Sequence, residues 1–220
     1  ALMVTPCRWQ VMSEVGFLFD LDGTLINSQI AVYDSWMQIA DEAGFHLPHL
    51  EGMHGLPASA SLKKLMPERS AEEIQRWAQR LEKVEIEAAG GVFAVDGAIE
   101  VLDFLSTHNV PWTIVTSCTM DLAKARADAA GIVMPHHSVT FDQVTLGKPH
   151  PEPFLLGAAR IKKSPENCWG IEDAPGGVRA AKSAGCTVAA VLTTHRKDEL
   201  LEADHHLQSL VDLLSISQLR

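Results

Sequence analysis

Residues 15–25 read Val-Gly-Phe-Leu-Phe-Asp-Leu-Asp-Gly-Thr-Leu, and this stretch decides the fold. Its first five residues form a short apolar run with aromatic side chains, which is typical of a buried parallel strand. The run ends abruptly at Asp20 and a glycine-containing turn. In a doubly wound sheet, reactive groups collect at the carboxyl ends of the strands. We therefore expect a strand over 15–19 that delivers Asp20 and Asp22 to that edge.

From residue 96 onward the chain alternates between strand and helix patterns. Short apolar runs predict strands at 112–115, near 139, at 168–171, at 187–192 and at 205–207. Helical spacing predicts helices around 99–105, at 119–130, at 151–161 and at 175–184. Such alternation predicts a parallel sheet covered by helices on both faces. The expected fold class is α/β, with a Rossmann-like doubly wound parallel sheet as its core.

A block of helices interrupts this pattern directly after the first strand. Helical spacing predicts one helix over 28–44 and a second over 74–88, with no clear element between them. The sequence therefore predicts an α/β core made of 12–24 plus 96–220 and an inserted all-helical cap over 25–95. The two crossings between these parts flank the first loop, so we expect the cap to act as a lid; a dimerisation surface is the alternative.

The composition excludes several classes of function. The chain of 220 residues carries a net charge of −10, and an acidic surface repels nucleic-acid backbones and anionic membranes. We therefore expect neither nucleic acid nor a membrane as a partner. No apolar run approaches the ~18–20 residues of a membrane-spanning helix, and residues 1–10 do not resemble a signal peptide. The four cysteines are scattered, which indicates free thiols in a cytoplasmic protein.

Chemically active side chains fall at four places that the predicted topology brings to one edge of the sheet. They are Asp20 and Asp22, then Thr116 and Ser117, then Lys148, and finally Glu172 and Asp173. Each pair alone is common by chance. Their joint occurrence in this order, mostly at successive strand ends, predicts one active site.

The carboxylates predict a magnesium site. A cluster of hard oxygen ligands without thiolate or histidine partners suits Mg²⁺. We expect Asp20, the backbone carbonyl of Asp22 and Asp173 to hold the ion, with Glu172 as an outer or secondary metal group. Such an ion removes the repulsion between an anionic nucleophile and a phosphate monoester. Asp20 would then attack phosphorus and form an aspartyl-phosphate.

The remaining groups complete a hydrolytic reaction. Asp22 would protonate the leaving oxygen and later deprotonate water, a role that requires a pKa raised by neighbouring carboxylates or by closure of the site. Thr116 and Ser117 would bind the phosphoryl group, Ser117 together with N–H groups of the following helix. Lys148 would supply the compensating positive charge.

These stretches resemble the four motifs of the haloacid dehalogenase superfamily, and the helical insert resembles its C1 cap. The motifs are residues 19–25, 114–117, 147–153 and 171–177. The resemblance covers residues 15–215, and it implies Mg²⁺, a cytoplasmic location and a small phosphorylated metabolite as substrate. Two positions depart from the pattern. Asn27 stands where many relatives carry Asp, and Cys118 stands where a smaller Gly or Ala is usual, which places a thiol beside the phosphate site.

Within the superfamily, the chain resembles bacterial sugar (hexitol) phosphatases. It is also similar to fungal glycerol-phosphate and 2-deoxyglucose-6-phosphate phosphatases. The resemblance rests on His54-Gly55, Arg80-Leu-Glu82 and residues 111–117. It implies a sugar or polyol phosphate, with His54, Gly55 and Glu82 as substrate-binding residues of the cap. A surface histidine and a solvated helix carboxylate are the plain alternatives for His54 and Glu82.

Three functions remain open at this stage. Hydrolysis is expected, by a monomer or weak homodimer; phosphoryl transfer of the β-phosphoglucomutase kind, on the same scaffold, is the alternative. In those mutases a cap-entrance His and a cap-loop Arg engage the phosphosugar, and the resemblance places Val32 and Ala58 at these positions. A non-catalytic binding or regulatory protein would be supported by loss of a motif residue, and none is lost.

Overall fold

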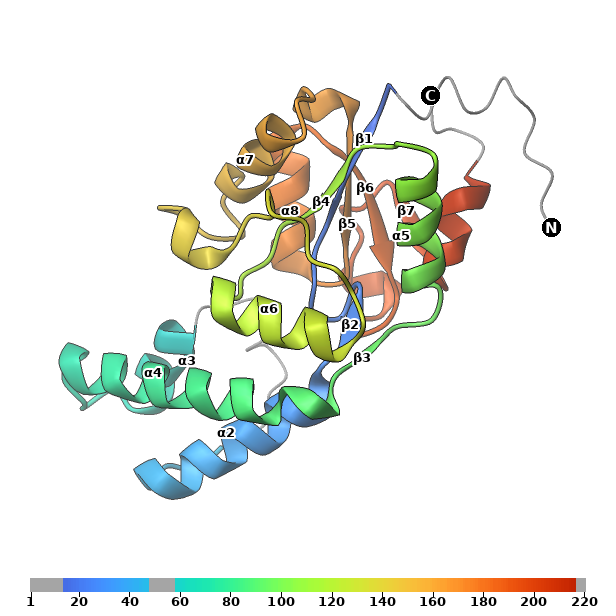
Figure 1. The fold of residues 1–220 in the computed structure, drawn as a ribbon. Helices are drawn as coiled ribbons and strands as arrows, with labels where there is room; N and C mark the ends of the chain where they lie inside the picture. The colour runs from blue at the N-terminus through green and yellow to red at the C-terminus, as the bar shows by residue number, and fades with distance from the viewer. Residues whose placement is uncertain (1–13, 48–57, 217–220) are drawn as a thin grey trace.

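The computed structural model describes residues 14–47 and 58–216. Its centre is a five-stranded sheet with the strand order β4-β1-β5-β6-β7, in which every neighbouring pair is parallel (Figure 1). The strands are β1 (Gly16–Phe19), β4 (Trp112–Ile114), β5 (Cys168–Glu172), β6 (Thr187–Val191) and β7 (His205–Leu207). The prediction of an α/β protein with a Rossmann-like parallel sheet is confirmed.

The central strand β1 is buried on both faces. Phe17 and Phe19 belong to one hydrophobic cluster, whereas Leu18 belongs to another, because alternate side chains of a strand point to opposite faces. All three side chains are fully buried. A strand with apolar residues on both faces must be covered on both, which explains the uninterrupted apolar run in the sequence.

Two groups of helices supply that cover. The cluster of Phe17 and Phe19 includes residues of α5 (Ala98–Thr107) and α6 (Met120–Ala129). The cluster of Leu18 includes residues of α7 (Glu152–Arg160) and α8 (Pro175–Ala184). In Figure 1 α5 lies on one side of the sheet, with α7 and α8 on the other. Short 3-10 turns complete this part of the chain: η2 (Phe141–Gln143), η3 (Pro165–Asn167), η4 (Lys197–Glu199) and η5 (Leu210–Ser215).

The first three helices after β1 form a separate unit, which we term the helical block: α2 (Gln29–Ala43), α3 (Ala58–Leu65) and α4 (Ala71–Glu87). The block has a hydrophobic cluster of its own, which includes Trp36, Ile39, Leu62, Ile74 and Leu81. In Figure 1 it lies beside α6, away from the sheet.

The helical block begins and ends at neighbouring points. Its entrance, β2 (Ile26–Asn27), pairs in antiparallel fashion with β3 (Phe93–Ala94), which follows its last turn, η1 (Ala88–Gly91). The two crossings that we expected between core and cap therefore lie side by side. No helix within the described ranges is both long and apolar enough to cross a membrane.

Three local predictions differ from the structure. Helix α3 was not predicted, because only Ser61 and Leu62 of its eight residues are buried and they show no helical period. Helix α4 begins before its predicted start at residue 74, because Ser70 and Glu73 form a capping box there. Near residue 139 the chain forms only an isolated bridge, between Val139 and Val115, instead of a strand.

Candidate active site

The residues predicted at the four motifs meet at one edge of the sheet, most of them at the ends of adjacent strands. Asp20 follows β1, Glu172 ends β5, and Lys148 reaches the same place from the loop before α7. Because β4, β1 and β5 are neighbours, their carboxyl ends converge. The convergence point is a cavity of about 300 Å³ between this edge and the helical block, lined by residues of both.

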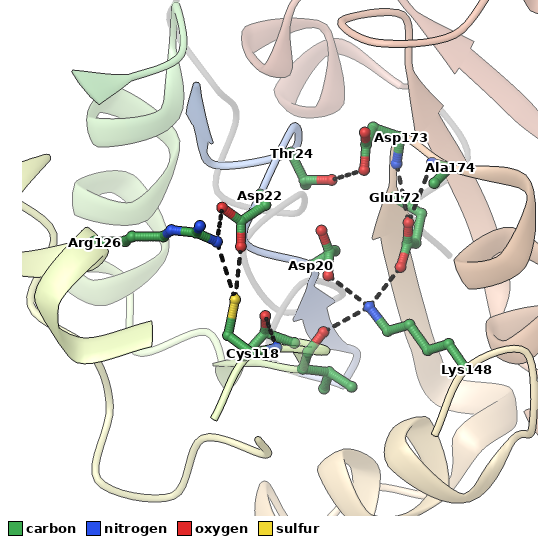
Figure 2. Close-up of polar contacts among 11 residues, drawn as sticks. Asp20, Asp22, Thr24, Cys118, Arg126, Lys148, Glu172, Asp173 and Ala174 are labelled. Carbon is green, nitrogen blue, oxygen red and sulfur yellow. Dashed lines mark hydrogen bonds and ion pairs between the residues drawn. The ribbon is translucent and has the colours of Figure 1, made fainter. Parts of the chain in front are cut away.

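Lys148 is the centre of the polar contacts around Asp20. Its Nζ donates to Asp20 Oδ1 and Glu172 Oε1, each at 2.6 Å, and to the backbone oxygen of Val115 at 2.8 Å (Figure 2). Burial alone would lower the pKa of Lys148, but the Asp20 and Glu172 carboxylates outweigh it and raise that pKa. Lys148 is therefore a buried, permanently charged ammonium beside the candidate nucleophile.

Three carboxylates cluster at this point, and Lys148 pairs with two of them. Asp20, Glu172 and Asp173 each place an oxygen within 4.8 Å of the others. Burial, opposed by the neighbouring lysine, raises the pKa of Asp20 to about 7; burial and the Asp20 charge raise that of Asp173 to about 7. A buried excess of negative charge made of hard oxygens fits a divalent cation such as Mg²⁺. Glu172 also accepts the backbone N–H groups of Asp173 and Ala174, which fixes its carboxylate on its own loop.

Two glycines of the predicted motifs are required by close contacts with these carboxylates. Gly23 has φ +88°, and a Cβ added there would lie 2.1 Å from Asp173 Oδ2. A Cβ on Gly177 would lie 1.8 Å from Glu172 Oε1. Either distance is far below van der Waals contact, so only glycine fits at these positions.

Asp22 faces a different group of side chains, as Figure 2 shows. Its Oδ1 accepts from Ser28 Oγ at 2.6 Å and from an Arg126 nitrogen at 2.9 Å, and its Oδ2 accepts from Cys118 Sγ at 3.0 Å. Burial alone would raise the pKa of Asp22, but the Arg126 guanidinium and these hydrogen bonds lower it below its usual value. The expectation of a raised pKa at Asp22 is thus wrong for this state of the site.

Arg126 is the functional candidate that sequence reasoning missed. It lies on α6 with only 5% of its side chain exposed, and it forms a second ion pair with Glu85 of α4 at 3.2 Å. A signal was available, because Arg126 falls four residues after Leu122 on the buried face of α6. An arginine at an apolar position of a helical pattern needs a buried counter-ion, and the sequence does not show which acid supplies it.

The side chains predicted to bind the phosphoryl group lie near Asp20. Thr116 and Ser117 follow β4 and line the cavity. The Thr116 hydroxyl accepts the backbone N–H of Cys118 at 3.1 Å, so it also stabilises its own turn. Burial and the Asp22 charge raise the pKa of Cys118 well above its ordinary value, which keeps this residue a neutral thiol.

The helical block forms the opposite wall of the cavity. Glu82 lines the cavity and accepts a hydrogen bond from the Thr119 hydroxyl. Val32 and Ala58 also line it, as do Gln75 and Gln79 of α4, which sequence reasoning did not select. The predicted substrate-binding residues His54 and Gly55 lie outside the described residues.

The geometry agrees with comparisons to known proteins. A family model for haloacid dehalogenase-like hydrolases matches residues 17–191. The chain is 40% identical over 204 residues to hexitol phosphatase A of Escherichia coli (strain K12), covering 92% of this chain and 94% of that protein. It is 32% identical over 196 residues to glycerol-1-phosphate phosphohydrolase 2 of Saccharomyces cerevisiae, covering 84% of this chain and 77% of that protein.

A solved structure supports the fold. β-Phosphoglucomutase of Clostridium difficile superimposes with a TM-score of 0.80 at 24% identity, covering 90% of this chain and 92% of that chain. The chain belongs to the haloacid dehalogenase-like hydrolase family. The prediction of a phosphoric monoester hydrolase of this family is confirmed.

Proposed function

We propose that the chain is a Mg²⁺-dependent phosphatase that hydrolyses a small sugar or polyol phosphate through an aspartyl-phosphate on Asp20. The observation that carries the proposal is the buried set of Asp20, Glu172 and Asp173 around one lysine, at the bottom of a cavity. Relatives named for hexitol and glycerol 1-phosphate support the substrate class.

The metal is proposed from the donor set. Asp20, Asp173 and the backbone carbonyl of Asp22 would hold Mg²⁺, with Glu172 behind them. When bound, the ion offsets the charge of the carboxylates and polarises the phosphoryl group. The side chain of Asp22 is not one of the clustered oxygens, because it is turned toward Arg126 and Cys118.

In the first step, an Asp20 oxygen attacks phosphorus and the bond from phosphorus to the ester oxygen breaks. Lys148 offsets the charge on Asp20, while Thr116 and Ser117 bind the phosphoryl oxygens. In the second step, water attacks the aspartyl-phosphate and Asp22 takes the proton. The lowered pKa of Asp22 suits this second role directly; for the first, Asp22 must gain a proton before it can donate one to the leaving oxygen.

We propose hydrolysis instead of mutase chemistry because two residues that line the cavity are apolar. Val32 and Ala58 line the cavity, and neither side chain can donate a hydrogen bond or carry a charge. Neither of these two positions therefore offers a cation that could bind the sugar end of a phosphosugar and so help to exclude water from the aspartyl-phosphate. The fold itself does not discriminate, since a β-phosphoglucomutase shares it.

We also propose the division into an α/β core over 12–24 plus 96–220 and a cap over 25–95 that closes on the core. The separate hydrophobic cluster of the helical block and the paired crossings β2 and β3 support it. The cap would supply the contacts that choose among substrates, Glu82 among them. We propose a cytoplasmic location on the resemblance to cytoplasmic phosphatases and on free thiols at Cys118, Cys168 and Cys186.

The test is a phosphate-release screen with and without Mg²⁺ across hexose, hexitol, glycerol and nucleoside phosphates, with Asp20→Asn as the matched inactive variant. We expect Mg²⁺-dependent release from sugar or polyol phosphates by the wild type alone. Faster release from nucleoside monophosphates than from every sugar or polyol phosphate would contradict the substrate class. Interconversion of β-glucose 1-phosphate and glucose 6-phosphate would contradict hydrolysis.

A further inference from the structure

We propose that Arg126 is a positioning residue that fixes the carboxylate of Asp22, and that Glu85 of α4 in turn holds Arg126. The inference rests on the proposed function, because it concerns the acid and base of that reaction. As a consequence, contact between the helical block and α6 sets the orientation of the Asp22 carboxylate, which lies in the loop after β1.

Arg126 lies between the loop after β1 and the helical block. Its guanidinium is buried between two carboxylates from distant elements: Asp22 after β1, at 2.9 Å, and Glu85 of α4, at 3.2 Å. A buried ion pair contributes little net stability compared with apolar residues of the same volume. Stability alone therefore does not account for a cation at this position of α6.

The carboxylate of Asp22 is fixed by hydrogen bonds on both of its oxygens. Both of its oxygens accept hydrogen bonds, Oδ1 from Ser28 and Arg126, and Oδ2 from Cys118. The same Arg126 nitrogen lies 3.3 Å from Cys118 Sγ, so one guanidinium contacts both the carboxylate and its thiol donor. Arg126 is therefore the shared partner that fixes the direction of the carboxylate.

Two acids of α4 connect the helical block to the region of α6. Glu82 and Glu85 are three residues apart on α4 and so lie on one face of that helix. Both meet the α6 region, Glu82 at Thr119 and Glu85 at Arg126. Displacement of α4 would remove one of the two carboxylates of Arg126 and leave its charge under-compensated in a buried place. Contact between α4 and α6 thus favours the position of Arg126 in which it binds the Asp22 carboxylate.

The experiment compares leaving groups. Arg126→Ala and Arg126→Lys are assayed with Mg²⁺ on glycerol 1-phosphate, which has a poor leaving group, and on p-nitrophenyl phosphate, which has a good one. Misplacing the leaving-group acid should lower kcat on the alkyl ester about 100-fold and kcat on the aryl ester less than about 10-fold, since general acid catalysis contributes about 10²–10⁴. Arg126→Lys should lie between wild type and Arg126→Ala. Free guanidinium at low millimolar concentration should restore part of the alkyl-ester activity of Arg126→Ala.

Lys124→Ala is the matched control, because Lys124 is a cation of the same helix with 67% of its side chain exposed, and it should keep wild-type kinetics. Equal losses on both esters, or no loss on either, would overturn the inference while wild type stays active. If wild type released phosphate from no sugar or polyol phosphate in the screen above, the proposed function would fail and the inference with it. Melting temperatures show whether each variant is folded. If Arg126→Ala does not fold, the comparison of the two esters is made with Arg126→Lys.

A double-mutant cycle tests the role of Glu85. Glu85→Gln should show the same selective loss on the alkyl ester, about 3- to 10-fold, and should add little to Arg126→Ala, because residues that act as one unit are not additive. Glu87→Gln is the control, as an exposed acid on the same helix. Fully additive losses would overturn the assignment of Glu85, and a selective loss in Glu87→Gln would show that any charge change on α4 has this effect.

Discussion

The two aspartates of the β1 loop are two residues apart, yet their surroundings differ in nearly every respect. Asp20 shares one lysine with Glu172 and lies beside Asp173, so three buried carboxylates meet one cation. Burial, together with this excess of negative charge, raises the pKa of Asp20 to about 7 despite Lys148. The charge on the Asp20 side therefore fits a further cation, the proposed Mg²⁺.

The Asp22 side is complete without one. Asp22 has an arginine of its own and two further hydrogen-bond donors, and its pKa is lowered even though burial opposes this. The difference suggests a physical basis for the two roles proposed above: the carboxylate proposed for covalent attack meets a lysine, and the carboxylate proposed for proton transfer meets an arginine. The loop brings both acids to the cavity, and distant residues decide their chemistry.

The largest expected effect comes from removing the charge of Asp20. Asp20→Asn should abolish turnover, by about 10⁴-fold or more, because a neutral amide cannot form the acyl-phosphate. The fold should remain, which circular dichroism and the melting temperature check. Residual activity within tenfold of wild type would show that Asp20 is not the nucleophile.

Asp22→Asn tests the proposed proton transfer separately from the covalent step at Asp20. The amide keeps the size of the side chain but cannot transfer the proton, so kcat on glycerol 1-phosphate should fall about 10²- to 10³-fold. The loss on p-nitrophenyl phosphate should be smaller, because its leaving group needs little protonation. Equal losses on the two esters would refute the proton-transfer role of Asp22.

Metal binding should depend on pH through the Asp20 side alone. Without metal, Asp20 and Asp173 have pKa values raised to about 7, so they bind protons more tightly when folded than when unfolded. Their contribution to stability is thus largest at low pH and is lost as pH rises through about 7. Mg²⁺ needs the deprotonated forms, so its binding becomes stronger over the same range.

The measurement is the Mg²⁺-induced rise in melting temperature, which should be larger at pH 8 than at pH 6. Asp173→Ala should remove most of that rise, whereas Asp204→Ala, a change at an exposed acid paired with Lys182, should keep it. Equal shifts at both pH values, or full activity in excess chelator, would contradict the proposal.

Much of this arrangement follows from the sequence, and the omissions share a cause. The five strands and the convergence of Asp20, Glu172 and Asp173 follow from apolar runs and from the rule that strand ends carry the reactive groups. Lys148 reaches the same place from a loop, so that rule does not cover it. These signals are local. The sequence also placed Asp22 correctly but assigned the wrong direction to its pKa.

That error has a physical reason. The pKa of Asp22 depends on Arg126, which is 104 residues away in the sequence and on another element. Local pattern identifies Arg126 as an unusual residue of a buried helix face and does not identify its partners. Helix α3 was missed for a related reason, since its buried Leu62 lies in a cluster formed with distant residues and the helix packs against α4.

The smallest expected effects concern the wall opposite both aspartates. Gln75, Gln79 and Glu82 line the cavity from α4 at spacings of four and three residues, so they lie along one face of that helix. Amide and carboxylate groups on one face can pair with several hydroxyls of a polyol, while the proposed loops of the sheet edge would bind the phosphoryl group.

Gln79→Ala and Glu82→Ala should therefore change the ranking among hexitol, hexose and glycerol phosphates. One lost hydrogen bond corresponds to about 0.5–1.5 kcal/mol, or roughly a 2- to 13-fold change in kcat/KM. The rate on p-nitrophenyl phosphate should change much less, because that substrate has no hydroxyls for the wall to bind. Gln38→Ala is the matched control, since Gln38 is an exposed glutamine of α2 that donates to Glu42. An unchanged ranking in Gln79→Ala and Glu82→Ala would mean that substrates are chosen elsewhere in the cavity.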